Sequence, residues 1–593
     1  MSRELKGVSV ANGMAIAPIV HFHTDFDYIP ARRIDAAAVP AEVARLDEAI
    51  TATSRGILHL RHELSTTLSQ NDTRIYDAQL ALLHDKTVRA DLVKEIDHEK
   101  INAEMALQRV IARYEKVFER MEDIVMRERA ADIRDVGRQV LGALLARERS
   151  VYIAGGADYI FVADEFLPSD AGLLDRCQLR GIATARGGKY SHGAILARSL
   201  GIPAVLAVEE LLLKARSGDQ VILDGDAGMV LLRPTDEELA RYRQLIEERA
   251  VVDRRLSELN DAEPITKDGA TIWLGANVES VRDLHDLRDR SVAGVGLFRT
   301  EFAFMERLQF PAEEEQCRMY RTAIESLAAG QVLTFRTLDI GGDKPLRYFR
   351  TPEERNPVLG WRGLRISLDW PDIFFTQVRA ILRAGAGTDA RVRILLPMVT
   401  NHGEVRRSVD VIRQIQADLR EAREPQAEHV QIGVMVEVPA LAEILDLVLP
   451  LVDFVSVGTN DLVQYLLAVD RDNPRVAGMY DPYHPGVVRL LARMAQACQA
   501  AGKPVSICGE IAGDHYFTPL LIGLGFRELS MAPVFLPRVK LMVRSFHVDE
   551  CVRLAEVALR ATDAQTVRTA VREHCRVRWA QFLDESGGGS TRA

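Results

Sequence analysis

The run FVSVGTND at residues 454–461 is an apolar, strand-like segment that ends in polar residues. It is one of eight such runs after residue 265, and helical segments separate most of them. The other seven are TIWLGAN (271–277), GVGLFRT (294–300), VLTFRTLD (332–339), RILLPMV (393–399), IGVMVEV (432–438), PVSICGE (504–510) and ELSMAP (528–533). This alternation predicts a (β/α)8 TIM barrel. An open doubly wound sheet is the alternative, and the even spacing of the strands favours closure.

Polar side chains gather where these runs end. They are Asn277, Arg299, Arg336, Asp339, Glu437, Asn460, Asp461, Cys508 and Glu510. Catalytic groups of TIM barrels lie at the carboxyl ends of the strands, so the pattern predicts a site on one rim. The alternative is that these residues only begin solvated loops.

The charges at this rim indicate the chemistry of the ligand. Arg299, Arg336, Lys344, Arg362, Arg365 and Arg471 supply cations that suit a ligand with phosphate and carboxylate groups. Glu437 and Asp461 are hard oxygen ligands on neighbouring runs and suit Mg²⁺. Cys508 faces this cationic cavity, and we expect the field to stabilise its thiolate, so that it can exchange a proton with the ligand.

The first part of the chain has a different pattern of hydrophobic residues and glycines. Strand-like and glycine-marked segments occupy residues 1–33 and 148–233, and amphipathic helical periodicity fills 34–147. We therefore predict one α/β domain, 1–33 plus 148–233, into which a helical bundle is inserted at 34–147. A charged linker helix follows at 234–262, then the barrel at 263–576 and a disordered tail at 577–593.

A histidine in the α/β domain lies in the stretch GGKYSHGAILARS at residues 187–199. Ser191 is a natural N-cap residue and Gly201 a natural stop, so His192 is predicted to lie in the first turn of a helix. Unpaired backbone N–H groups there favour an anion and disfavour an imidazolium. A neutral imidazole beside an anion site is a candidate phosphoryl acceptor, although an ordinary surface histidine fits the same pattern.

Composition excludes several classes. A hydrophobic fraction of 47% with 27% charged residues is ordinary for a globular protein, and the net charge of -10 argues against nucleic acid or anionic lipid as partner. No run approaches the roughly 20 apolar residues of a membrane span, and no signal peptide is evident, so we expect a cytoplasmic protein. Six scattered cysteines indicate buried thiols rather than disulfides or a zinc site.

Several segments resemble one known family. GGKYSHGAILARSLGIPAV (187–205) resembles the phosphohistidine signature of phosphoenolpyruvate (PEP)-utilising enzymes, and DFVSVGTNDLVQYLLAVDR (453–471) resembles their barrel signature. RERAADIRDVGRQVL (127–141), NPVLGWRGLRISL (356–368) and SICGEIAGD (506–514) are similar to Enzyme I, the PEP-protein phosphotransferases of the bacterial phosphotransferase system. The likeness runs from about residue 5 to residue 575.

This resemblance implies a phosphohistidine α/β domain that swivels, with an inserted helical bundle, followed by a PEP-binding TIM barrel that also forms a homodimer. His192 would accept the phosphoryl group from PEP, and Cys508 would protonate the enolate to give pyruvate. The group would then pass to a histidine of HPr, a small carrier protein docked on the helical insert. The remaining expected site residues are Glu437 and Asp461 for Mg²⁺, Arg299, Arg336, Lys344, Arg362, Asn460 and Arg471 for PEP, and Thr184 for orienting His192.

The histidine loop departs from the family pattern. The family usually has TD before the glycines and TSHT at the histidine, whereas this chain has Ala185, Arg186, Tyr190 and Gly193 in those places. Arg186 could contact the phosphoryl group, and Tyr190 could shield the phosphohistidine. The departures leave open the identity of the carrier and the transfer rate.

The resemblance favours an Enzyme I of the sugar phosphotransferase system, the sugar branch, and three alternatives remain beside it. A nitrogen-branch Enzyme I would run the same chemistry into a regulatory phosphorelay but usually carries an N-terminal sensory domain, which we do not expect here because the sequence starts directly at the transferase. Pyruvate phosphate dikinase and PEP synthase also need an ATP-binding domain, and no GxxxxGK[ST] loop is present. A catalytically silent scaffold would be expected to have lost at least one of the residues singled out above.

Overall fold

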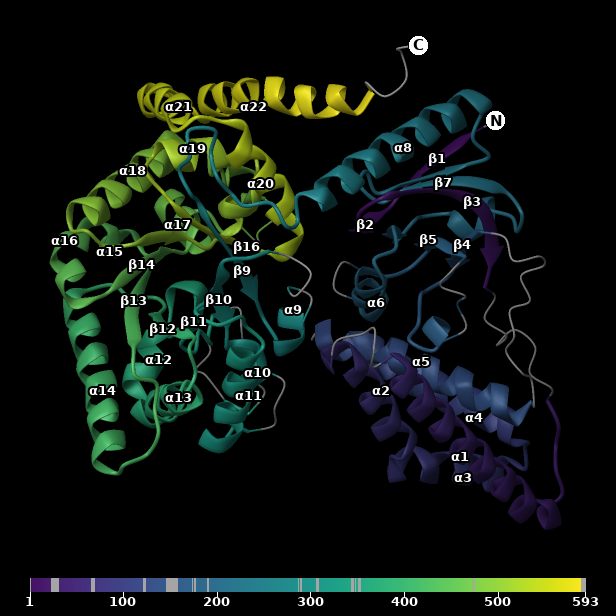
Figure 1. The fold of residues 1–593 in the computed structure, drawn as a ribbon. Helices are drawn as coiled ribbons and strands as arrows, with labels where there is room; N and C mark the ends of the chain where they lie inside the picture. The colour runs from purple at the N-terminus through teal and green to yellow at the C-terminus, as the bar shows by residue number, and fades with distance from the viewer. Residues whose placement is uncertain are drawn as a thin grey trace. The chain divides into compact units, whose positions relative to one another are not determined.

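The eight strand-like runs after residue 265 form a closed barrel of parallel strands in the computed structural model of the protein (Figure 1). The strands are β9 (Trp273–Val278), β10 (Gly294–Arg299), β11 (Val332–Arg336), β12 (Arg391–Leu396), β13 (Val430–Val436), β14 (Phe454–Val457), β15 (Val505–Ile507) and β16 (Glu528–Met531). β16 pairs with β9 and closes the ring, so the open-sheet alternative is wrong.

The structure describes residues 2–22, 31–64, 70–120, 124–145, 158–172, 174, 178–188, 191–285, 287, 291–305, 309–342, 346, 348–349, 354–471, 473 and 475–587. Within the helices and strands, it describes no side chain at 62–64, 70–74, 119, 124–129, 172, 192, 195, 199, 282, 285, 580–581 and 583–587. Two compact units, residues 1–250 and 251–593, divide the chain.

Helices surround the barrel strands in the second unit. They are α9 (Val281–His285), α10 (Glu301–Met305), α11 (Glu313–Glu325), α12 (Leu364–Asp369), α13 (Pro371–Ala384), α14 (His402–Glu421), α15 (Pro439–Glu443), α16 (Leu445–Val448), α17 (Thr459–Leu467), α18 (Pro485–Ala500), α19 (Thr518–Gly523), α20 (Leu536–Ser545), α21 (Val548–Arg560) and α22 (Ala564–Gly587). Short 3₁₀ turns are η4 (Pro357–Leu359), η5 (Leu449–Leu451), η6 (Ala477–Met479), η7 (Glu510–Gly513) and η8 (Pro533–Phe535).

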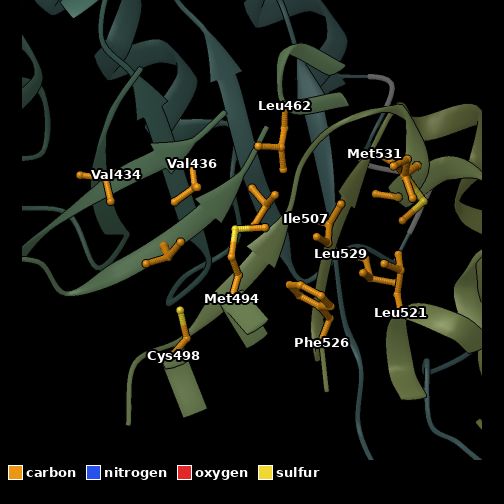
Figure 2. Close-up of a cluster of buried hydrophobic side chains, with 14 of the residues drawn as sticks. Val434, Val436, Leu462, Met494, Cys498, Ile507, Leu521, Phe526, Leu529 and Met531 are labelled. Atoms are coloured by element: carbon orange, nitrogen blue, oxygen red, sulfur yellow. The ribbon is translucent and has the colours of Figure 1, made fainter. Parts of the chain in front are cut away.

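The core of the second unit lies between strands and helices. Val434 and Ile507 on the strands pack with Leu462 of α17, Met494 of α18 and Leu521 of α19 (Figure 2). Alternate residues of the strands therefore face the helices, and the others face the barrel interior, as the period of two along a strand requires.

The last helix corrects the expected tail. α22 runs to Gly587, so residues 577–587 are helical, whereas the sequence had indicated a disordered segment from residue 577. Trp579 and Phe582 pack against the barrel core, and Arg578 forms an ion pair with Glu550 at 2.9 Å. Tertiary packing therefore stabilises a helix that local composition does not predict. Residues 588–593 lie outside the described part.

The first unit is built on one eight-stranded sheet with the order β1-β8-β7-β3-β4-β5-β6-β2. Its strands are β1 (Arg3–Lys6), β2 (Val8–Ala11), β3 (Met14–His21), β4 (Tyr159–Ala163), β5 (Leu179–Thr184), β6 (Ala204–Leu206), β7 (Gln220–Asp224) and β8 (Met229–Leu232). β3 pairs with both β4 and β7, so strands from before and after the helical segment share the sheet.

The helical segment between β3 and β4 forms a bundle (Figure 1). It contains η2 (Ala36–Ala38), α1 (Val39–Leu64), α2 (Gln70–Leu83), α3 (Lys86–Glu99), α4 (Ala103–Glu119) and α5 (Ile124–Leu144). The sheet also carries η3 (Asp170–Gly172), α6 (His192–Leu200) and α7 (Leu211–Lys214). A charged helix, α8 (Asp236–Glu258), follows where the linker was predicted and runs from the first unit into the second.

The predicted fold class is thus confirmed: an α/β domain with an inserted helical bundle, then a (β/α)8 barrel. The domain limits at single residues stay predictions. In the part of the chain that the structure covers, no helix is both long and apolar enough to cross a bilayer. Cys498, Cys508, Cys551 and Cys575 are buried free thiols as expected, whereas Cys317 is half-buried.

Candidate active site

The carboxyl ends of β10, β11, β13, β14 and β15 surround a cavity of about 160 Å³. Seven of the predicted site residues line it, namely Arg299, Arg336, Glu437, Asn460, Asp461, Arg471 and Cys508. A neighbouring cavity of about 490 Å³ shares Arg299 and Cys508 with it and extends along β9 and β16. The structure therefore brings together these seven polar residues that the sequence placed at one rim, whereas Asp339, Arg362 and Arg365 do not line this cavity.

Two buried arginines are fixed by carboxylates below this cavity. The Arg336 guanidinium forms ion pairs with Glu301 and, at 3.2 Å, with Asp339. Asp339 also pairs with Arg362 at 3.1 Å, so one carboxylate orients both arginines. Nε of Arg336 is buried and has no hydrogen-bond partner among the described residues. A ligand oxygen could satisfy this donor, because a buried unpaired N–H is costly.

Glu301 was missed in the sequence. Its side chain is fully buried at the start of α10, directly after the strand that carries Arg299. An acidic residue inside the apolar stretch GLFRTEFAF was the available signal. Its partner Arg336 lies 35 residues further along, so local spacing could not identify the pair.

Glu437 and Asp461 lie on adjacent elements at the cavity. Glu437 follows β13 and is 2% exposed, and Asp461 lies in the first turn of α17. The backbone at Gly458 approaches Glu437 closely, because a Cβ there would lie 2.9 Å from Glu437 Oε2 and 3.0 Å from the Glu437 Cβ. Burial, together with the nearby Asp461 and Asp339 carboxylates, raises the pKa of Glu437 to about 8. A cation at this place would relieve the repulsion between these carboxylates.

The remaining polar residues of the cavity are held by neighbours. Arg299 donates a 2.7 Å hydrogen bond to Glu279 and remains partly exposed. Asn460 exchanges two hydrogen bonds with Glu510, since its amide donates at 3.1 Å and its carbonyl oxygen accepts from the Glu510 N–H at 2.8 Å. The Arg471 backbone N–H is bonded to Gln464 at 3.1 Å. These contacts fix the rim before a ligand arrives.

Cys508 lies at the end of β15 and is 2% exposed. Its S–H donates to the Val457 carbonyl at 3.5 Å. Burial raises the pKa of this thiol to about 11, although the neighbouring arginines act in the opposite direction. The expectation of a thiolate is therefore wrong, because desolvation outweighs the cationic field. A neutral buried thiol can donate a proton, which is the role that the resemblance implied.

The predicted helix at the histidine is present. α6 begins at His192, the Ser191 hydroxyl accepts from the Ala194 N–H at 3.3 Å, and Gly201 ends the helix with a φ of 66°. The backbone of His192 is therefore in the first helical turn, as expected, and its side chain lies outside the described part. A Cβ at Gly193 would meet the Phe166 carbonyl oxygen at 2.5 Å, so α6 approaches the loop after β4 closely.

Two further residues of this loop have defined partners. Thr184 is fully buried, and its hydroxyl donates to the Arg186 carbonyl at 2.5 Å. Its oxygen retains the capacity to accept a hydrogen bond. The Arg186 guanidinium lies 3.3 Å from Asp164, an ion pair the sequence had not indicated. Tyr190 and Lys344, both named in the sequence interpretation, lie outside the described residues.

A buried polar network joins the helical bundle to the loop after β4. Asp135 of α5 accepts hydrogen bonds from Ser169, through its backbone N–H at 3.0 Å and its hydroxyl at 2.5 Å. Arg138 of the same helix pairs with Asp170, and its Nη2 donates to the Ser169 hydroxyl at 2.8 Å. All four side chains are buried. The bundle and the loop beside α6 are therefore connected by charged groups as well as by apolar packing.

Comparisons with known proteins match this architecture. Three family models cover the chain: "PEP-utilising enzyme, N-terminal" at residues 6–129, "PEP-utilising enzyme, mobile domain" at 155–228 and "PEP-utilising enzyme, PEP-binding domain" at 253–548. Phosphoenolpyruvate-protein phosphotransferases from Staphylococcus carnosus and Listeria monocytogenes are each 36% identical. Both matches cover 97% of this chain, with 99% and 100% of the relatives' lengths, respectively.

The fold, the residues at the rim of the barrel and the matching family models together define an enzyme that uses PEP. The full-length relatives specify the reaction: the chain belongs to the phosphoenolpyruvate-protein phosphotransferases, the Enzyme I family of the phosphotransferase system. It is therefore an enzyme that transfers a phosphoryl group from PEP to protein.

Proposed function

We propose that His192 is the residue that receives the phosphoryl group from PEP bound in the barrel. The P–O bond of PEP breaks, a P–N bond forms to the imidazole, and the electron pair of the broken bond stays on the enolate oxygen. The N-terminal position of His192 in α6 supports this, because unpaired N–H groups there favour an anionic phosphoryl group. His192 also lies inside the segment that matches the mobile domain of PEP-utilising enzymes.

The single observation that carries the proposal is the cavity lined by three arginines, three carboxylates and a thiol at one end of the barrel. Arg299, Arg336 and Arg471 would hold the phosphoryl oxygens, where fixed cations stabilise the charge that spreads during transfer. Asn460, Lys344 and Arg362 would bind the rest of PEP. Glu301 and Asp339 already orient the Arg336 guanidinium, so this side chain needs little reorganisation when PEP binds.

Glu437 and Asp461 fit a Mg²⁺ site. They are two oxygen donors at one cavity, and burial, together with the neighbouring Asp461 and Asp339 carboxylates, raises the pKa of Glu437. The described residues contain no cluster of three or more metal-binding side chains, which suits an ion that takes its remaining oxygens from substrate and water. When bound, Mg²⁺ would neutralise negative charge on the phosphate and enolate oxygens.

Cys508 would complete the first half-reaction. Its S–H bond breaks as a C–H bond forms at C3 of the enolate, which gives pyruvate. The neutral thiol in the cavity is in the protonation state this step needs. Thr184 would orient His192 by accepting a hydrogen bond from the imidazole.

In the second half-reaction the phosphoryl group would pass to a histidine of HPr, docked on the bundle α1–α5. We further propose that the protein is cytoplasmic, forms a homodimer through its barrel and serves the sugar branch. The network between Asp135 and Ser169 supports a carrier site on the bundle, because it ties that bundle to the loop beside α6. A nitrogen-branch carrier is the second candidate, since the loop around His192 departs from the usual sequence.

The proposal is tested with PEP labelled at phosphorus. The wild type and His192→Ala are incubated with labelled PEP and Mg²⁺, and bound label is assayed for acid lability and base stability. Label on the wild type alone would identify His192, and label on both proteins would place the acceptor elsewhere. Glu437→Gln should abolish labelling at a Mg²⁺ concentration that saturates the wild type, and chelation of Mg²⁺ should do the same reversibly.

The branch is tested by offering sugar-type and nitrogen-type HPr in parallel to the phosphorylated enzyme. Faster transfer to the sugar-type carrier is expected. Faster transfer to the nitrogen-type carrier would refute the assignment while leaving the chemistry at His192 intact.

A further inference from the structure

The segment that carries Cys508 forms one wall of the active-site cavity. Cys508, Gly509 and Glu510 line the cavity, and the 3₁₀ turn η7 continues the chain behind it. On the cavity side, the Cys508 N–H donates to the Val457 carbonyl at 3.1 Å, and Glu510 exchanges two hydrogen bonds with Asn460. The position of this wall also depends on what holds the chain after η7.

The chain after η7 is held by side chains of the C-terminal helix α22. The centroid of the His515 ring lies 4.2 Å from that of Tyr516 and 5.2 Å from that of Trp579 of α22. The Cys575 thiol of the same helix donates to the Tyr516 carbonyl at 3.5 Å. Nε2 of His515 is buried and has no hydrogen-bond partner among the described residues, so at this atom packing holds the ring.

A further contact from α22 reaches the same segment through Tyr483. The Tyr483 hydroxyl donates to the Asp514 carboxylate at 2.9 Å, and the Arg568 guanidinium of α22 lies 4.9 Å from the centroid of the Tyr483 ring. A cation over an aromatic face is attracted to it. Arg568, Cys575 and Trp579 are spaced by seven and four residues, so they lie on one face of the helix. That face of α22 therefore holds the chain at residues 514–516.

We propose that Trp579 is a positioning residue of the reaction, because it holds the segment that places Cys508 against the substrate. This inference rests on the proposed role of Cys508 as proton donor. In that step the S–H bond breaks, a C–H bond forms at C3 of the enolate, and the electron pair remains on sulfur. A small displacement of a reacting group is costly, since the geometry of the encounter supplies much of the rate.

The proposed phosphate site is built from other segments. Arg299 is on β10, Arg336 is on β11, and Arg471 follows α17. In the described residues, the contacts of Trp579 run to His515 and to Phe582 of its own helix, and none joins it to these arginines. Loosening of the chain after η7 therefore acts on the proton step and leaves PEP binding nearly unchanged.

Other contacts of α22 fix the helix without reaching this segment. Arg578 forms an ion pair with Glu550 of α21 at 2.9 Å and lies 5.6 Å from the centroid of the Phe546 ring. His574 stacks on the same ring with centroids 4.9 Å apart. Docking of α22 can therefore be weakened here while the chain after η7 keeps its partners, which separates a positioning role from a general effect on stability.

The test compares Trp579→Ala with the wild type in two measurements. The first is hydrogen–deuterium exchange in the full-length protein, followed on peptides that cover residues 508–518. We expect exchange there to accelerate about tenfold, because a lost packing contact favours local opening. The second is single-turnover pyruvate formation at increasing PEP concentration with saturating Mg²⁺. The limiting rate should fall about tenfold, whereas the half-saturating PEP concentration and the rate of enzyme labelling should stay within about twofold of wild type.

Three variants on α22 serve as rescue and controls. Trp579→Phe keeps an aromatic ring against His515 and should recover most of the limiting rate. Val577→Ala changes an exposed side chain of the same helix and should alter neither measurement. Arg578→Ala should lower the urea concentration at which the barrel unfolds, because it removes the ion pair with Glu550, while exchange at 508–518 and the limiting rate stay at the wild-type values.

Arg568→Gln replaces Trp579→Ala if the latter does not fold. It removes the guanidinium over the Tyr483 ring and its 2.8 Å hydrogen bond to Asp481. It should accelerate exchange in the same peptides and slow pyruvate formation in the same direction, but by less, because the contact between Trp579 and His515 remains.

The outcomes separate this inference from the proposed function. If Cys508→Ala forms pyruvate at the wild-type rate, the role of Cys508 is wrong and the inference falls with it. If Cys508→Ala is slow but Trp579→Ala keeps wild-type exchange or a wild-type limiting rate, the inference alone is refuted. An equal loss of rate in Arg578→Ala also refutes it, because the rate would then follow the docking of α22 in general. Faster exchange with slower pyruvate formation, normal labelling and rescue by Trp579→Phe supports both.

Discussion

Replacing Gly193 by alanine should destabilise the first unit, although alanine normally stabilises a helix. Gly193 is the second residue of α6, and a Cβ there would lie 2.5 Å from the Phe166 carbonyl oxygen. Real Cβ atoms essentially never come closer than 3.0 Å, so the two backbones must separate by at least 0.5 Å (3.0 minus 2.5). The loop cannot move freely, because the Tyr76 hydroxyl holds the Pro168 carbonyl at 2.9 Å and Asp135 holds Ser169.

The magnitude follows from two opposing effects. Forcing an extra methyl group into a packed site costs about 1–3 kcal/mol. The gain in helix propensity from glycine to alanine is up to about 1 kcal/mol and is smaller near a helix end. The expected net loss for Gly193→Ala is therefore about 1–2 kcal/mol. Gly142→Ala in α5 is the matched helical control, because nothing lies within 4 Å of its Cβ, and it should be neutral or slightly stabilising.

The assay uses the placement of the tryptophans. All four, Trp273, Trp361, Trp370 and Trp579, are in the second unit, so tryptophan fluorescence follows the barrel alone. In urea, Gly193→Ala should shift the circular dichroism transition of the first unit to lower concentration and leave the fluorescence transition unchanged. A variant as stable as Gly142→Ala would refute the reasoning about Phe166.

Further predictions concern the barrel. Glu301→Gln should lower its free energy of unfolding by about 3 kcal/mol, because it removes a carboxylate from buried Arg336; a loss below about 0.5 kcal/mol in urea unfolding would contradict this. Burial lowers the pKa of His515 and His574, so the unfolded chain binds protons more readily than the folded protein near pH 6. The free energy of unfolding of the barrel, followed by tryptophan fluorescence, should therefore fall as the pH drops below about 6.5. The double replacement of both histidines by glutamine should flatten that dependence, and an unchanged slope would argue against it. Because burial raises the pKa of Cys508 to about 11, pyruvate formation should show no loss from thiol deprotonation between about pH 6 and 9, whereas a pH-dependent loss of rate that parallels iodoacetamide labelling of Cys508 would disprove this.

The fold was accessible from the sequence because its signals are local. Each barrel strand is an apolar run bounded by polar residues, and eight of them recur in order, so the closed barrel follows from periodicity and spacing. The tail from residue 577 was misjudged because its helix depends on Trp579 packing on the barrel, a tertiary contact without a local signal.

The candidate site divides in the same way. Strand ends placed Arg299, Glu437 and Cys508 at one rim, and the structure has them around one cavity. The protonation state of Cys508 was misjudged because the residue type shows the neighbouring charge but not the depth of burial, and burial decides the sign here. The ion pair between Glu301 and Arg336 joins residues at the ends of two different strands, so it can be identified only from the folded structure.

The buried network of Asp135, Arg138, Ser169 and Asp170 determines which segments of the first unit must be exchanged together in a chimera. A chimera that replaced the bundle between β3 and β4 with that of a relative would bring new partners for Asp170 while retaining the old loop after β4. Unmatched carboxylates or guanidinium groups would then be trapped away from water. An exchange meant to alter carrier preference should therefore transplant residues 164–170 together with the bundle.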